Sequence, residues 1–286
     1  MDKAIVIGAY HFLGFHVCNT LLNKGIEVTG ILLNEMDKIP FLDEKRMEVG
    51  RNANFHEQSI FNLGHASDKT TKITLMISYY DFYMLHREAL LADNKIIKPI
   101  MEYIEHQEQL NLVLFLPMPM QMQEIGVNGH LIESFRNPST NAQLFHLPSL
   151  YGTWQPSTFL FQQVIRSKFG KSMNKMKSTR EWTKDIIFVD DAVETLMELI
   201  ENGNSGNFQL ESGKEHYWEE CARFLQAGES FNHQKSLRNI KVNGDFTTVS
   251  VKRLSSISES LSIQIEHERW LDQSSMINSE TEKGGN

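Results

Sequence analysis

The amino-acid sequence predicts an α/β protein built on a doubly wound parallel sheet. Short apolar runs recur along its 286 residues and alternate with helical segments, as they do where crossover helices join parallel strands. The first apolar run leads into a glycine-bracketed turn and then a helix, which is typical of a βαβ unit. A chain of this length is close to the upper limit for one domain and can bury a sizeable core.

The βαβ unit occupies the first 33 residues. Residues 3–7 (KAIVI) form a short apolar run of the kind buried on both faces in a parallel sheet. The turn runs from Gly8 to Gly14, and residues 15–24 form a helix that Gly25 ends. Residues 26–33 (IEVTGILL) form the second strand, and we expect a right-handed crossover between the two.

The remaining elements follow the same alternation. Pro99 is expected to kink or interrupt its helix, and Asp191 with Glu194 resembles a capping box at the start of a helix that Gly203 ends. Further strands are predicted at residues 72–79, 110–116, 143–147 and 185–189, and further helices at 86–106, 125–136, 159–169 and 191–202.

Composition excludes several classes of protein. A net charge of −8, from 28 basic and 36 acidic residues, argues against a nucleic-acid scaffold. No apolar run is long enough to span a bilayer, and the N-terminus does not read as a secretory signal. Cys18 and Cys221 are the only cysteines, which favours a reducing cytoplasm over a disulfide framework. A basic cluster from Arg166 to Lys184 reads either as a solvated surface or as a funnel for an anionic ligand.

Three stretches carry a resemblance to a known family. They read IVIGAYHFLGFHVCNTLLNKGIEVTG at residues 5–30, LFHLPSLYGTWQP at 144–156 and KDIIFVDDAVETL at 184–196. In order and spacing they resemble the extended short-chain dehydrogenase/reductase superfamily, the NAD-dependent epimerase/dehydratase group. The second stretch keeps Pro148, Tyr151 and Gly152 of that pattern, and the third is the most specific.

The resemblance implies a Rossmann-like architecture over residues 1–272 with an NAD(P)-binding core and a small C-terminal lobe. The expected core covers about 1–152 and 185–212, and the lobe about 153–184 and 213–272. Residues 273–286 are polar and end in glycines, so we expect a disordered tail there.

The cofactor loop departs from the family pattern. That loop is Gly-x-x-Gly-x-x-Gly, because glycines let the backbone approach a pyrophosphate at a helix N-terminus. Gly8 and Gly14 match, but His11 takes the middle position and would project toward the pyrophosphate. Three interpretations of the loop remain open. It is a turn that binds nothing, a site where His11 pairs with a phosphate, or a site where the cofactor binds in a displaced position. We expect no cofactor or weak NAD(P), on a vestigial site of Gly8, His11, Phe12, Leu13 and Gly14.

Other dinucleotide contacts are also missing from the sequence. A carboxylate usually ends the second strand and holds the ribose. Here the strand ends at Leu32 and Leu33, with Asn34 and Glu35 as substitutes if it ends early. The adenine-binding Asp of the family falls in residues 56–59, which lack an Asp, although Ser59 could form a hydrogen bond.

The catalytic residues that the resemblance implies are absent, so we assign none. The family pairs a Tyr with a Lys four residues later, the Lys tuning the Tyr as general acid or base. None of the seven tyrosines has a Lys at that spacing, and Gly126 and His130 fall at the two expected positions. The family's Ser or Thr is missing too, because residues 79–133 contain neither.

A few other residues are candidates to replace the missing catalytic groups. Tyr79, Tyr80, Tyr83 and His86 cluster near the expected cleft, where aromatic residues more often pack than react. Tyr83 and Arg87 share the four-residue spacing but sit on the wrong element. The pair Asp190 and Asp191 opens a helix and reads as capping, so no metal site is predicted, and Cys18 is expected to be buried and inert.

The function predicted is a degenerate, catalytically silent member of the group, a pseudoenzyme that acts as a cytoplasmic binding or regulatory protein. One alternative is an active NAD(P)-dependent epimerase, dehydratase or reductase on a nucleotide-sugar or carbonyl substrate. A second is a dinucleotide sensor. The expected partner is a small molecule or a protein, not nucleic acid or membrane, and the resemblance implies a homodimer as a further option.

Overall fold

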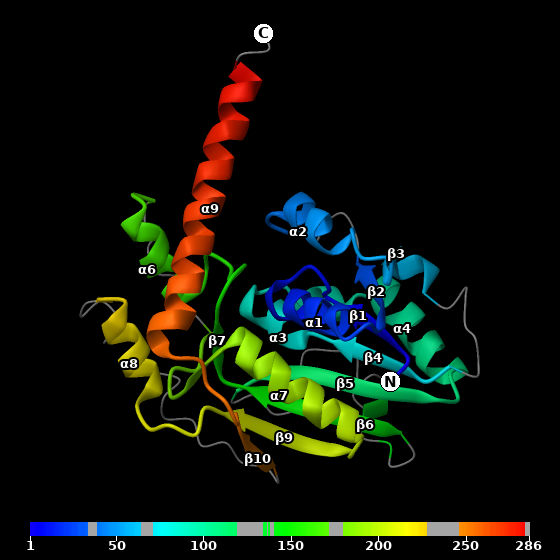
Figure 1. Ribbon diagram of the computed structural model, residues 1–286. Coiled ribbons are helices and arrows are strands. Elements are labelled where there is room, and N and C mark those ends of the chain that lie inside the picture. Colours follow the sequence, from blue (N-terminus) through cyan, green and yellow to red (C-terminus); the bar gives the residue numbers. More distant parts are fainter. Residues whose placement is uncertain are drawn as a thin grey trace.

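The structure, a computed structural model, describes residues 1–33, 39–63, 71–118, 134–135, 137, 140–171, 180–227 and 246–283, with side chains to residue 274. Its main sheet has eight strands, and every neighbouring pair is parallel (Figure 1). The strands in sheet order are β10 (Thr247–Ser250), β9 (Gly206–Glu211), β6 (Asn141–Leu147), β5 (Leu110–Pro117), β4 (Ile73–Ile77), β1 (Lys3–Ile7), β2 (Glu27–Leu32) and β3 (Phe55–Ser59).

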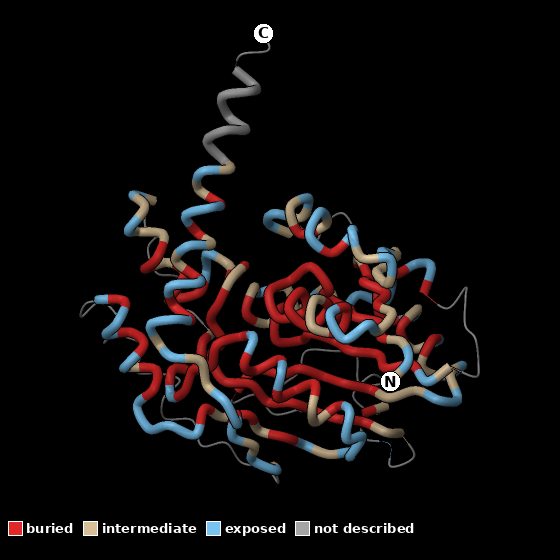
Figure 2. Tube along the Cα trace, viewed as in Figure 1, coloured by how far each residue is buried: buried red, intermediate tan, exposed pale blue. Residues whose placement is uncertain are grey.

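Burial explains why the central strands are apolar. Strand β1 pairs with both β2 and β4, and all five residues of β4 are buried (Figure 2). A strand covered by helices on both faces has no solvent side, so its sequence is continuously apolar rather than alternating. The doubly wound α/β architecture expected from the sequence is confirmed.

Helices form a layer on each face of the sheet. Helices α1 and α7 pack together on one face, in the same apolar cluster as Val6 and Phe145, and α4 covers the other face with Leu75 and Leu114. The helices are α1 (Phe12–Asn23), α2 (Leu42–Val49), α3 (Tyr79–Met84), α4 (Asn94–His106), α6 (Leu160–Lys168), α7 (Val189–Asn202), α8 (Tyr217–Phe224) and α9 (Ile257–Lys283), with short 3-10 helices η1 (Ile60–Asn62) and η2 (Glu88–Ala92).

A smaller lobe has its own apolar core. Helices α6, α8 and α9 bury Phe161, Trp218 and Leu261 against a two-stranded parallel sheet of β7 (Ser149–Tyr151) and β8 (Ile186–Phe188). Two boundaries differ from those expected. Strands β7 and β8 both fell within the expected core but belong to this small sheet, and β10, expected within the lobe, extends the main sheet beside β9.

Three expectations about helices need correction. Helix α7 begins at Val189 with no side-chain cap, and Asp191 bonds Ser255 instead, so the capping box is wrong. The expected helix 86–106 is broken before α4 rather than at Pro99, which lies inside α4. Helix α9 continues to Lys283, where a disordered tail was expected from residue 273. The expected helix 125–136 lies almost wholly outside the described residues.

Candidate functional site

The glycine turn joins the carboxyl end of the central strand β1 to the N-terminus of α1. Gly8 has a φ of +90°, which side-chain-bearing residues rarely adopt. A Cβ on Gly14 would lie 2.1 Å from the carbonyl oxygen of Gly8, so the helix can approach the turn only with glycine there. The turn therefore keeps the backbone geometry of an anion-binding loop.

The carboxylate of Asp81 occupies the N-terminus of α1. Its Oδ1 accepts a hydrogen bond from the backbone N–H of Leu13, and its Oδ2 accepts one from Gly14, each at 3.0 Å. The Ser78 hydroxyl donates to Oδ2 at 2.7 Å and holds the carboxylate in place. Backbone N–H groups in the first turn of a helix are the donors that would bind a phosphate. Here they are satisfied by an anion of the chain itself.

His11 stands at the N-cap of α1 and is buried. Its ring meets that of Phe82 edge to face, with the centroids 4.9 Å apart. The histidine lines a cavity bounded by α1, α2, α6, α9 and the residues after β7. His11 thus faces the region where a cofactor cleft would open, as the sequence predicted for its position.

A buried lysine on α2, Lys45, lines the same cavity as His11. Lys45 is 4% exposed, and its Nζ donates to the carbonyl oxygen of Tyr10 in the glycine turn at 2.7 Å. The Nζ also lies 5.6 Å from the ring centroid of Phe15 and 5.5 Å from that of Trp154. Burial lowers the pKa of Lys45 to about 8. The cavity has a volume of about 60 Å³, against roughly 300 Å³ or more for the pockets that hold drug-sized ligands.

An ion pair between Arg46 of α2 and Glu57 of the edge strand β3 lies beside the turn. Arg46 donates to both carboxylate oxygens of Glu57 at 2.8 Å, and the Tyr10 hydroxyl donates to the same carboxylate at 2.6 Å. The Arg46 guanidinium lowers the pKa of Glu57. Ser59, considered for adenine, instead accepts a hydrogen bond from the N–H of Phe61 and caps η1.

This arrangement does not fit a dinucleotide bound in the manner of the fold. A pyrophosphate at the turn would have to displace Asp81, whose three hydrogen bonds would be lost. It would also need more space than the cavity offers. Strand β2 ends at Leu32, with no carboxylate there for a ribose, and Asn34 and Glu35 lie outside the described residues.

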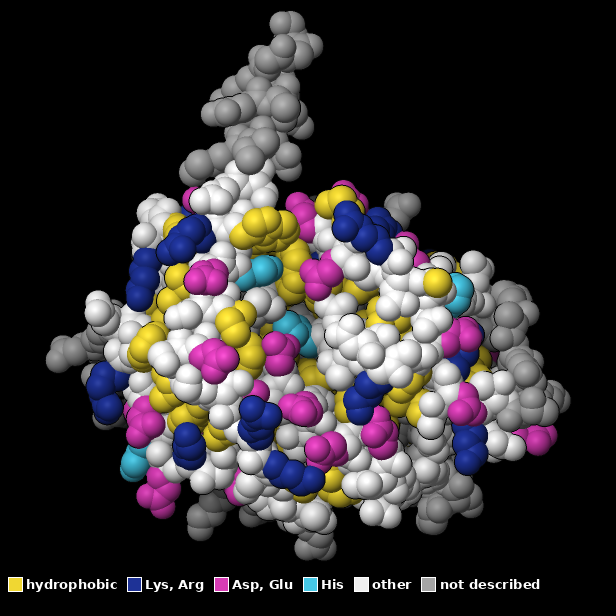
Figure 3. All heavy atoms as spheres, viewed as in Figure 1, with side chains coloured by type: hydrophobic (Ala, Val, Ile, Leu, Met, Phe, Trp, Pro, Cys, Tyr) yellow, Lys and Arg dark blue, Asp and Glu magenta, His cyan; other side chains and the backbone are white. Residues whose placement is uncertain are grey.

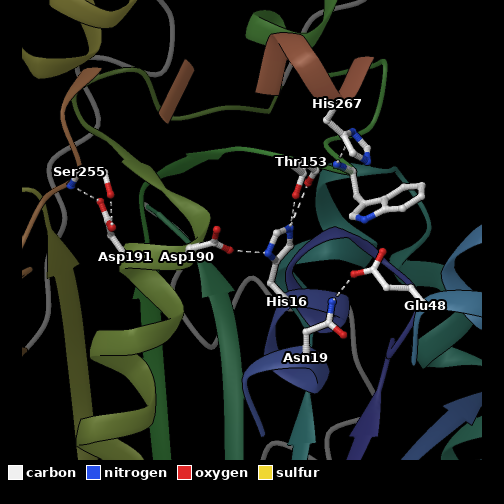
Figure 4. A network of polar contacts seen from close by, with 9 residues as sticks. His16, Asn19, Glu48, Thr153, Asp190, Asp191, Ser255 and His267 are labelled. Atoms are coloured by element: carbon white, nitrogen blue, oxygen red, sulfur yellow. Dashed lines mark hydrogen bonds and ion pairs between the residues drawn. The ribbon is translucent and has the colours of Figure 1, made fainter. Parts of the chain in front are cut away.

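A histidine ties α1 to the lobe (Figure 4). His16 bonds Asp190 through Nδ1 at 2.6 Å and the carbonyl oxygen of Thr153 through Nε2 at 3.0 Å. Asp191 points the other way, toward Ser255. The two aspartates thus serve two separate structural contacts. No group of three or more metal-ligating side chains occurs in the part of the chain that the structure describes.

The tyrosines considered as reserve catalysts are divided among different contacts. Tyr80 is fully buried, and its oxygen accepts a hydrogen bond from the N–H of Leu150. Burial raises the pKa of Tyr80 well above the usual value for tyrosine. Tyr83 stacks on Tyr79 and lies under the guanidinium of Arg180, 4.3 Å from its ring centroid. His86, at the end of this segment, is exposed and has a positive φ of 56°.

Four other sequence expectations concern a cysteine, the basic cluster, the catalytic positions and a membrane span. Cys18 is buried, and burial raises the pKa of its thiol. Within the basic cluster, Lys171 pairs with Glu268 and Asp272, and Arg180 pairs with Glu88. Residues 119–133, with the expected catalytic positions Gly126 and His130, lie outside the described residues. Among the described helices, none combines the length and the apolar character that a bilayer crossing requires.

Comparison with known proteins places the fold. No family model matches the sequence. The UDP-glucuronic acid 4-epimerase of Bacillus cereus, solved with UDP-glucuronic acid and NAD, superposes with a TM-score of 0.63 at 14% identity, covering 94% of this chain and 99% of that one. The dTDP-glucose 4,6-dehydratase of Bacillus anthracis str. Ames, solved with NAD, gives 0.61 at 10% identity over 94% and 97%.

The chain therefore has the fold of the extended short-chain dehydrogenases/reductases that act as NAD-dependent epimerases and dehydratases. The resemblance found in the sequence is confirmed at that level. Among curated proteins, the uncharacterized protein YjaV of Bacillus subtilis (strain 168) is 30% identical over 87 residues. The match covers 30% of this chain and 44% of that protein, so it spans less than half of the relative's length.

Asp81 and Lys45 are the two site residues that the sequence analysis missed. Asp81 reaches the turn from 67 and 68 residues away in the chain, and Lys45 from 35 residues away. Neither belongs to a periodic pattern. The only local signal was an acidic residue three positions after Ser78, at the end of a buried strand.

Proposed function

We propose that this chain is a catalytically silent binding or regulatory protein that has kept the epimerase/dehydratase fold without its use of a dinucleotide. The observation that carries the proposal is the pair of hydrogen bonds from Leu13 and Gly14 to the Asp81 carboxylate. A phosphate and a carboxylate compete for the same N–H donors, and a buried, hydrogen-bonded carboxylate is costly to displace. The two buried free cysteines accord with a cytoplasmic location.

The sequence supports the same proposal independently. Proton transfer needs a group of matched pKa within reach of the reacting oxygen. The chain has no Tyr with a Lys four residues later and no Ser or Thr in residues 79–133. Losing one positioned acid or base typically lowers a rate by ~10²–10⁴-fold. We therefore expect no turnover of UDP-glucuronic acid or dTDP-glucose above background.

The test is a calorimetric titration of the full chain with NAD and with NADP, on the wild type and on two variants. Asp81→Ala frees the two N–H groups of α1 and should raise NAD affinity at least tenfold. Asp93→Ala is the matched control, since Asp93 caps α4 through the N–H of Lys95, away from the turn. It should leave NAD binding as weak as in the wild type.

Each alternative has its own outcome. Micromolar NAD binding by the wild type without turnover would favour the dinucleotide sensor and sink the proposal. Turnover of a nucleotide sugar would favour an active enzyme with relocated residues. NAD affinity that Asp81→Ala leaves unchanged would refute the role given to Asp81.

A further inference from the structure

The cavity beside Lys45 combines a few charged side chains with apolar walls. Figure 3 shows the face hollowed between α9 and α2, with histidine side chains in the hollow. The walls of the cavity include Phe12, Phe41, Leu85, Trp154 and Leu271. Apolar walls with a few fixed polar groups are typical of small-molecule sites.

Lys45 keeps hydrogen-bonding capacity that the described residues do not use. An ammonium has three N–H donors. Among the described residues its one hydrogen-bond acceptor is the carbonyl oxygen of Tyr10. Asp81 attracts Lys45 through space, but both oxygens of that carboxylate are already engaged by Leu13, Gly14 and Ser78.

The other charges on the cavity are matched within the lobe. The Glu268 carboxylate accepts from Gln162 at 2.7 Å and from Lys171 at 3.0 Å, and Arg166 lies 3.6 Å from the same carboxylate. These contacts join α6, α9 and the residues after α6. Lys45 is therefore the cavity's cation with no ion-pair partner in direct contact among the described residues.

A second buried donor lies against the same indole as Lys45. The ring of His267 is 4.5 Å from that of Trp154, and its Nδ1 accepts a hydrogen bond from the backbone N–H of Trp154. Because Nδ1 accepts, the neutral ring carries its proton on Nε2. Burial, with the charges of His16 and Lys45, lowers the pKa of His267 to about 4, so the ring is neutral near pH 7. Nε2 is buried without a partner among the described residues.

We propose that this cavity binds a small aliphatic monocarboxylate, with the carboxylate on the Lys45 ammonium and the short chain against Phe12, Leu85 and Trp154. A volume of about 60 Å³ admits about four or five non-hydrogen atoms, which is the size of acetate or propionate. The inference rests on the proposed function, because a bound dinucleotide would fill the same region.

The test titrates the full chain with sodium propionate at constant ionic strength, by calorimetry and thermal shift. Propanamide, the neutral analogue of nearly the same shape, isolates the contribution of charge. Propionate should bind in the millimolar range, and propanamide at least tenfold more weakly. Benzoate, which exceeds the cavity, should also bind more weakly than propionate.

Two lysine variants complete the design. Lys45→Met keeps the side-chain volume without the charge and should lower propionate affinity at least tenfold. Lys252→Met is the matched control, because Lys252 is exposed and pairs with Glu198 far from the cavity. Propionate binding that survives Lys45→Met, equals that of propanamide or benzoate, or is absent at tens of millimolar overturns the inference. A parallel titration with NAD distinguishes failure of the proposed function from failure of this site. Micromolar NAD binding refutes the proposed function, whereas absence of propionate binding refutes only this site.

Discussion

Glu181 should make the stability of this protein fall as the pH rises from about 5 to 8. Its side chain is 3% exposed, and its Oε2 accepts a hydrogen bond from the N–H of Leu160 at the start of α6, at 2.7 Å. Its Oε1 is buried with no partner among the described residues. Burial raises the pKa of Glu181 from 4.5 to about 8, although the Leu160 N–H partly opposes the shift.

The magnitude follows from the difference between the folded and unfolded pKa values. Between pH 4.5 and 8 the unfolded carboxyl is ionised while the folded one keeps its proton, so the folded state binds more protons and stability falls with rising pH. A difference of about 3.5 pKa units, from 8 minus 4.5, corresponds to at most about 5 kcal/mol at 1.36 kcal/mol per unit. The local slope approaches about 1.4 kcal/mol per pH unit in that window.

Glu181→Gln removes the titration while keeping a carbonyl oxygen for the Leu160 N–H. Urea unfolding at pH 5, 6, 7 and 8 should show that the free energy of unfolding of the variant, relative to that of the wild type, increases by several kcal/mol as the pH rises. Glu105→Gln, at an exposed carboxyl on α4, is the control and should run parallel to the wild type. If the difference between Glu181→Gln and the wild type is the same at pH 5 and pH 8, the reasoning is refuted.

Three further predictions concern other buried polar groups. Lys45→Met should stabilise the fold at pH 7 by up to about 3 kcal/mol, from a pKa of about 8 against 10.5 unfolded. Because the folded pKa of Lys45 is lowered, the stability of the wild type should rise from pH 8 to 10.5, and the advantage of Lys45→Met should disappear by pH 10.5. An advantage that does not change with pH in urea unfolding would contradict this. Asp191→Ala should cost about 2–3 kcal/mol through its two bonds to Ser255, and Asp190→Ala, at a half-exposed carboxylate, less than about 1 kcal/mol; equal losses in thermal unfolding would argue against separate roles. His11→Gly alone should leave NAD binding undetectable in calorimetry because Asp81 remains on the turn, whereas His11→Gly with Asp81→Ala should bind; binding by the single variant would show that His11 is the main obstacle.

The order and type of most core elements could be predicted because each depends on local sequence. Apolar runs such as residues 3–7 and 110–116 mark buried parallel strands, and Gly25 and Gly203 end their helices as expected. The edge strand β10 was missed because three of its four residues are exposed and the fourth, Val249, is only partly buried. A strand at an edge carries little apolar signal.

The candidate site was less accessible to sequence reasoning. The glycine spacing predicted a turn after β1, but the turn is shorter than expected, because α1 begins at Phe12 and includes Gly14. The histidine between the two glycines was an evident departure from the family pattern. The group on the helix N-terminus is instead Asp81, which comes from the element after β4. A single carboxylate has no periodicity, and its contact depends on how strands β1 and β4 lie side by side. Such a contact is a property of the tertiary structure and leaves no local pattern.

The carboxylate of Asp81 acts on the turn as a tethered competitor. Because α3 holds it against α1, its effective concentration at the two N–H groups lies well above the millimolar values typical of flexible tethers. A free anion at cellular concentration competes against a group that never diffuses away. Under the proposed function, one residue thus lowers the affinity of the loop for phosphates, while the glycines that shape the loop stay in place.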